Sequence, residues 1–262
     1  MLIRKLSSRI LWGYYVYISL ISFVFLVQIQ LRFSVLNWNQ LIFAFFSTLG
    51  LYNLIYIFKT NIYRAPRLTL LVVSACICLH NFLHLSQQVQ TLLIPLVFFG
   101  GFYQLPPPSS FRGLRYLKGL KIVLISLSWF AMVYLMPAVS GDLKEDSLYL
   151  LFAYLWIFLW CLAFDIRDRK ADIGKIVTLA TFLDERSLKI LVIVVFSFAL
   201  VLRVSLGGQF LGIDIFMTCL VFFVNWIAFQ RKERLFYLAL VDGLPILWLL
   251  LLFLQNCQIL LL

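Results

Sequence analysis

Apolar runs long enough to cross a lipid bilayer recur from one end of this 262-residue chain to the other. Each run is close to the ~20 residues that a helix needs to span the hydrocarbon core of a membrane. Inside that core the backbone must satisfy its own hydrogen bonds, so such a chain folds as a helical bundle. Hydrophobic residues make up 63% of the sequence and charged residues only 13%, which excludes a water-soluble domain. We therefore expect one all-α integral membrane domain over residues 1–262.

Nine membrane spans are predicted. They cover residues 10–31, 38–58, 68–85, 89–105, 120–139, 147–164, 188–206, 210–229 and 235–262. A polar turn at 86–90 separates the third span from the fourth, and Pro95 predicts a kink in the fourth. The first span follows a basic start but has no small-residue cleavage pattern, so we expect it to be retained rather than removed as a signal peptide.

The basic residues indicate how the chain is oriented. With the N-terminus in the cytoplasm, all of the 22 Lys and Arg residues except Arg32, Lys144 and Arg203 fall on the inner side. This agrees with the rule that cytoplasmic loops are enriched in positive charge. We therefore expect a multi-pass protein of the cell or inner membrane, with its C-terminus outside and its chemistry on the cytoplasmic face. The net charge of +11 is explained by orientation, and nothing supports a nucleic-acid partner.

Three aspartates follow the sixth span. Asp165, Asp168 and Asp172 are spaced i, i+3 and i+7, which places them on one face of a continuing helix, within roughly 60° of each other. One interpretation is a solvated ion network with the neighbouring arginines and lysine. The other is a Mg²⁺ site, because this ion binds one or two carboxylates and leaves its other positions for phosphate oxygens. The spacing alone favours the ion network.

The wider pattern resembles the UbiA-type intramembrane prenyltransferase superfamily. The likeness rests on nine spans, a cytoplasmic N-terminus and the DxxDxxxD pattern of Asp165, Asp168 and Asp172 at the inner end of the sixth span. It implies a bundle around a central cavity open to the cytoplasm, and transfer of an isoprenyl group from its diphosphate to a lipophilic or aromatic acceptor. It also implies that the three aspartates are catalytic and hold Mg²⁺, which neutralises the departing diphosphate while a dry cavity shelters the carbocation.

The first aspartate motif of that family is altered in this chain. Where the family has N-D-x-x-D-x-x-x-D at the end of the second span, Asn53 matches, Asn61 replaces the last aspartate, and Leu54 and Ile57 replace the others. Neutral amides offer only carbonyl dipoles, so the predicted binding of Mg²⁺ is weakened. Asn53 and Asn61 remain expected substrate-binding residues. The basic residues expected to hold the diphosphate directly are Lys59, Arg64, Lys118 and Lys121.

Two functions therefore stay open. The first is a prenyltransferase that acts on an isoprenyl diphosphate and a lipophilic acceptor, and it is favoured because an unused DxxDxxxD would drift as readily as the first motif did. The second is a non-catalytic descendant that binds an isoprenoid or membrane lipid, or that serves as a partner subunit. A small-molecule transporter is disfavoured by the absence of sequence repeats and of ionisable residues along the middle of the spans.

Five other polar residues within the spans are candidates for a functional or a structural role. Asp242 lies about two turns into the last span, where a cavity-lining role and an ion pair are equally compatible with its position. His80 and His84 have the i, i+4 spacing of metal ligands, but interhelical hydrogen bonding is favoured because no further ligand is near in sequence. Asp214 and Arg203 are expected to snorkel or to pair near the outer surface.

Overall fold

The computed structural model describes residues 2–33, 36–59, 64–104, 119–141, 147–174, 176–230 and 236–260, and these ranges contain helices and no β-strand. The helices follow one another as α1 (Leu2–Arg32), α2 (Trp38–Lys59), α3 (Arg64–Leu83), α4 (Gln87–Gln104), α5 (Leu120–Phe130), the π-helical η2 (Ala131–Leu135), α6 (Met136–Val139), α7 (Ser147–Asp172), α8 (Leu179–Phe182), α9 (Glu185–Leu206), α10 (Leu211–Ala228), the π-helical η3 (Tyr237–Val241) and α12 (Leu244–Leu260). The prediction of an all-α protein is confirmed.

Seven helical stretches in the described part of the chain are long and apolar enough to cross a membrane. They are Tyr15–Arg32, Ala65–Leu83, Leu120–Val139, Ser147–Lys170, Glu185–Leu206, Leu211–Ala228 and Tyr237–Gln255. This supports a multi-pass membrane protein. The second and fourth predicted spans coincide with α2 and α4, which are helical but are not among the seven, so the count of nine and the orientation of the termini stay predictions.

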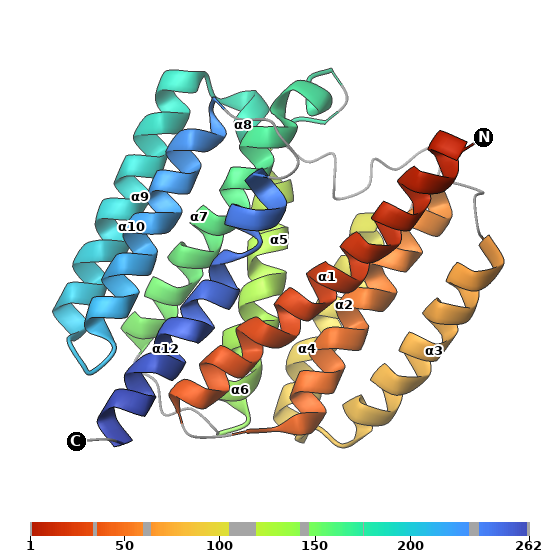
Figure 1. Ribbon diagram of the computed structural model, residues 1–262, viewed down its shortest axis with the longest axis horizontal. Helices are drawn as coiled ribbons and strands as arrows, with labels where there is room; N and C mark the ends of the chain where they lie inside the picture. Colours follow the sequence, from red (N-terminus) through yellow and green to blue (C-terminus); the bar gives the residue numbers. More distant parts are fainter. Residues whose placement is uncertain are drawn as a thin grey trace.

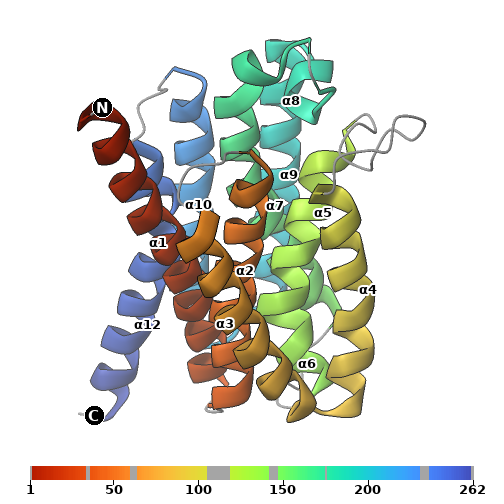
Figure 2. The same cartoon turned by 90° about the vertical axis from the view of Figure 1, so that its right-hand side faces the viewer.

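The long helices run side by side and alternate in direction (Figure 1). The C-terminal end of α7, the short helix α8 and the start of α1 all lie at one end of the bundle, which we call the α8 end. The C-terminus of α12 lies at the opposite end, together with the C-terminal ends of α1 and α9 (Figure 1). α3 stands at the edge of the bundle next to α2 (Figures 1 and 2).

Aromatic packing fixes α7 within the bundle. The ring of Phe25 on α1 lies 5.6 Å from that of Trp156 and 5.7 Å from that of Trp160, both on α7. Trp156 in turn packs 4.6 Å from Trp248 on α12. Aromatic pairs of this kind add about 1 kcal/mol each to the burial of the rings. This cluster joins the first and last helices to α7 and thereby holds the end of α7 in a defined place.

The path of the last helix is interrupted by the π-helical turn η3. The N–H of Asp242 donates to the carbonyl of Tyr237 at 2.8 Å, five residues earlier, as a π turn requires. Gly243 follows directly, and a Cβ atom at this position would overlap the carbonyl oxygen of Ala239. The backbone conformation that connects η3 to α12 therefore requires glycine at position 243.

We predict that Gly243→Ala destabilises the protein by about 2 kcal/mol, because the added methyl group forces the backbone of η3 to shift. The control is Gly212→Ala in α10, where an added Cβ meets no atom within 4 Å. Thermal unfolding in detergent micelles should show a lower midpoint for Gly243→Ala alone. Equal midpoints for the two variants would contradict this account of the turn.

Candidate functional site

The three aspartates predicted from the sequence all lie in the last two turns of α7, which ends at Asp172. The C-terminal end of a helix carries a partial negative charge, so carboxylates there are destabilised unless cations are near. The structure supplies these cations in two different ways. Asp165 and Asp172 contact a lysine of another helix, whereas Asp168 contacts the arginine next to it in sequence.

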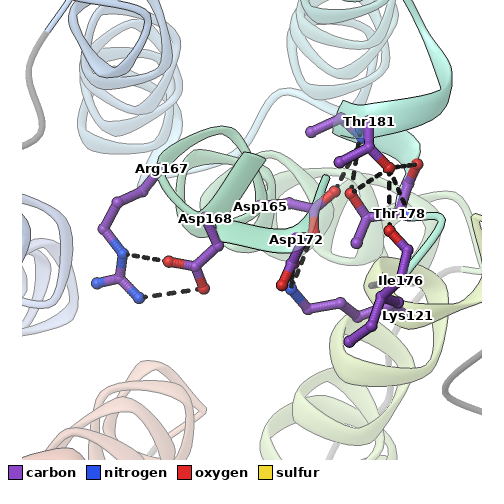
Figure 3. Close-up of polar contacts among 9 residues, drawn as sticks. Lys121, Asp165, Arg167, Asp168, Asp172, Ile176, Thr178 and Thr181 are labelled. Atoms are coloured by element: carbon purple, nitrogen blue, oxygen red, sulfur yellow. Dashed lines mark hydrogen bonds and ion pairs between the residues drawn. The ribbon is translucent and has the colours of Figure 1, made fainter. Parts of the chain in front are cut away.

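Lys121, at the start of α5, bridges Asp165 and Asp172 (Figure 3). Its Nζ lies 2.7 Å from Oδ2 of Asp172 and 3.3 Å from Oδ1 of Asp165. Only 3% of Asp165 and 9% of Asp172 is exposed, so these are charges held largely away from water. Among the described residues one ammonium serves two carboxylates, so this part of the cluster has one negative charge in excess.

Asp168 points away from this pair (Figure 3). Its Oδ1 accepts a hydrogen bond of 2.8 Å from Nε of Arg167, and both side chains are partly exposed. The guanidinium of Arg167 also lies over the ring of Tyr237, 4.9 Å from its centre. The structure therefore brings together two of the three predicted carboxylates, because Arg167 holds the third on another side of α7.

The segment after α7 folds back over Asp165. The N–H of Ala180 donates to Oδ2 of Asp165 at 3.0 Å. Thr178 and Thr181 cap α8 reciprocally, each side-chain oxygen accepting the backbone N–H of the other, at 3.2 and 2.8 Å. Sequence analysis missed these residues; the signal that would have found them is a threonine at the start of a short helix followed by a second polar residue three positions later. α8 thus forms one wall around the buried carboxylate.

The predicted substrate-binding residues are only partly described. Lys121 is part of the cluster, as shown above. Asn53 is buried in α2, and its amide donates to the carbonyl of Leu49 in the same helix at 2.7 Å. Lys59 and Arg64 end α2 and begin α3, but their side chains lie outside the described part, as do Asn61 and Lys118 altogether. The C-terminal end of α2 lies at the α8 end of the bundle, as does that of α7 (Figure 1).

The fit of a magnesium ion depends on Asp165 and Asp172. Among the described residues no group of three or more His, Cys, Asp and Glu side chains is placed to hold a metal. However, Asp165 and Asp172 already share one cation, the ammonium of Lys121, and Oδ1 of Asp165 accepts no hydrogen bond. Two carboxylates suit Mg²⁺ when substrate phosphates complete its coordination. These two carboxylates are the residues that would hold the ion, in place of the ammonium of Lys121, and Asp168 does not join them in this arrangement.

Of the other polar residues weighed from the sequence, Asp242 is buried, and its Oδ2 has no hydrogen-bond partner in the described part. His80 near the end of α3 and His84 just after it are both exposed, with ring centres 4.7 Å apart. Neither imidazole bonds to a described residue of another helix, so the predicted interhelical hydrogen bond is not observed there. Asp214 and Arg203, each of which was expected to snorkel or to pair, form an ion pair with each other, with 2.6 Å between Oδ2 and Nε.

Comparison with known protein families finds no match, and neither a comparison with curated proteins nor one with solved structures finds any. Membership of the UbiA-type superfamily therefore stays a prediction from the sequence pattern.

We predict that Lys121→Met lowers the free energy of unfolding by about 3 kcal/mol, because it leaves two buried carboxylates without their shared cation. Lys170→Met is the matched control, since Lys170 is an exposed residue of α7 at the same end. Titration of SDS into mixed micelles would measure both. If Lys121→Met unfolded no earlier than the control, the cluster would not be the stabilising contact described here.

Proposed function

We propose that this chain is a UbiA-type membrane prenyltransferase, which joins the isoprenyl group of an isoprenyl diphosphate to a lipophilic or aromatic acceptor. The observation that carries the proposal is that Asp165 and Asp172 converge on one cation at the end of a membrane-spanning bundle. Two of the three carboxylates of the DxxDxxxD pattern thus contact one cation, the ammonium of Lys121.

The proposed roles follow from the charges of the cluster. Asp165 and Asp172 would hold Mg²⁺, which neutralises a departing diphosphate when bound. With an ion between the two carboxylates, the ammonium of Lys121 would pair instead with an oxygen of the diphosphate. The contact of Ala180 with Asp165 orients that carboxylate and covers it from the α8 side.

We further propose that the chain has nine membrane spans, with α2 and α4 as the second and the fourth. The N-terminus would be cytoplasmic, and a central cavity would open at the α8 end. The distribution of charge supports the orientation, since Lys121, Arg167 and Arg169 lie at the α8 end whereas Arg32 and Arg203 lie at the opposite end. An isoprenyl chain is apolar, which accounts for a site within a membrane protein.

A second candidate function is a non-catalytic isoprenoid- or lipid-binding protein, or a partner subunit of a pathway enzyme. One observation favours it: the ammonium of Lys121 already occupies the position between the carboxylates, as in a structural ion network. The amide of Asn53, the one described polar residue retained from the first motif, donates to its own helix. In this case Asp165 and Asp172 would tie α5 to α7 without taking part in chemistry.

The test is a transfer assay with purified protein in nanodiscs, labelled prenyl diphosphates of several lengths, and mixed aromatic and lipid acceptors. We expect transfer that requires Mg²⁺ and stops with EDTA. Asp165→Asn and Asp172→Asn should each lower the rate about 100-fold or more, because each removes a charge that stabilises the transition state. Asp168→Asn should have a smaller effect, since its carboxylate contacts Arg167.

The control for charge removal is Glu185→Gln, an exposed acidic residue that begins α9 at the same end and pairs with Lys189. It should leave the rate unchanged. If no acceptor is prenylated while a labelled isoprenoid still co-purifies with the wild type and with Asp165→Asn, the second candidate function replaces the first.

A further inference from the structure

A second site lies at the end of the bundle opposite the aspartate cluster. There the C-terminal end of α1, the first turn of α7 and the connection from α9 to α10 line an open hollow of about 350 Å³. Its lining includes Arg32, Arg203, Tyr149, Phe210 and the adjacent glycines 207 and 208. Neither its position nor its residues belong to the proposed prenyl-transfer site.

Two arginines in this hollow share a single carboxylate. Nη1 and Nη2 of Arg32 lie 2.9 and 2.8 Å from the two oxygens of Asp214, and Nε of Arg203 lies 2.6 Å from one of them. The side chains are 7%, 2% and 0% exposed for Arg32, Arg203 and Asp214. Among the described residues this group therefore has one positive charge in excess, in a place where unmatched charge is costly.

The arginines keep donors for a further anion. A guanidinium has five N–H groups, and the contacts of Arg32 with Asp214 use two of them. The guanidinium carbon of Arg32 lies 4.8 and 4.9 Å from the ring centres of Tyr149 and Phe210, within the range of a cation–π contact. Arg203 also donates to the carbonyl of Gly207.

The two glycines keep the hollow open. Gly207 and Gly208 have φ of 61° and 95°, a conformation that other residues rarely adopt. A Cβ atom on either would meet no atom within 4 Å, so space is open beside both. The hollow lies where α1 and α9 end, which is the level of lipid headgroups for helices of spanning length.

We infer that this hollow binds a phosphate group, carried either by the headgroup of an anionic membrane lipid or by a free phosphate. Phosphate matches the planar donor edges of arginine and supplies the negative charge that the Arg32–Asp214–Arg203 group lacks. The volume is at the lower end of the range for small-ligand sites, which suits a headgroup rather than a whole lipid. Two of the three basic residues expected on the outer side thus serve a binding site.

The test uses Gln209→Glu, which adds a negative charge to the lining of the hollow and leaves the three charged residues in place. Gln209 is exposed, and its backbone carbonyl accepts a hydrogen bond from Gln255 that the substitution retains. The matched control is Gln88→Glu, the same change at an exposed position of α4 at the same end. The full-length protein is purified in an uncharged detergent, and its unfolding midpoint is measured with each probe.

The probes are phosphatidylglycerol against phosphatidylcholine, and inorganic phosphate against chloride at equal ionic strength. We expect one of the two phosphate probes to raise the midpoint of the wild type and of Gln88→Glu, and to bind about tenfold more weakly to Gln209→Glu. A shift with the lipid alone identifies a headgroup, and a shift with inorganic phosphate identifies a free anion. No shift with either probe, or equal shifts in both variants, would overturn the inference and leave the arginines a structural role.

Discussion

A charge buried in a membrane protein has to be matched by a partner, and this bundle meets that requirement at both ends with a shared ion. At the α8 end the ammonium of Lys121 serves Asp165 and Asp172. At the opposite end the carboxylate of Asp214 serves Arg32 and Arg203. Neither group is neutral among the described residues, and the excess has opposite sign at the two ends. A negative excess favours an added cation and a positive excess an added anion, so the two proposed ligands follow from one principle.

α7 links these two ends. Its middle is held by aromatic packing with α1 and α12, its last turns carry the aspartates, and its first turn contributes Tyr149 to the arginine site. When the backbone of a helix is held by packing, the positions of the residues at its two ends are also fixed. Both ion groups are therefore held in place by hydrophobic contacts that carry no charge themselves.

The sequence predicted the helices well because the length and spacing of apolar runs in a membrane chain leave few alternatives. It also placed Asp165 and Asp172 on one face of α7, since helical periodicity decides that. It did not separate Asp168 from them, because the contact with Arg167 depends on side-chain rotamers rather than on spacing. The pairing of Arg32 with Asp214 joins residues 182 positions apart, and no local pattern reports such a contact. The π turns were not predicted either, because their residues are as apolar as those of the α-helices beside them.

The π turn η2 has a consequence for how its span tolerates changes in length. A π turn contains one residue more than the α-helical hydrogen-bonding pattern requires. Because η2 lies directly between α5 and α6, deletion of one of its residues would restore a continuous α-helix and leave α5 and α6 in their present register. Elsewhere in α5 or α6 the same deletion would rotate every following side chain to another face. η2 is thus a point at which this span can be shortened by one residue without repacking the bundle.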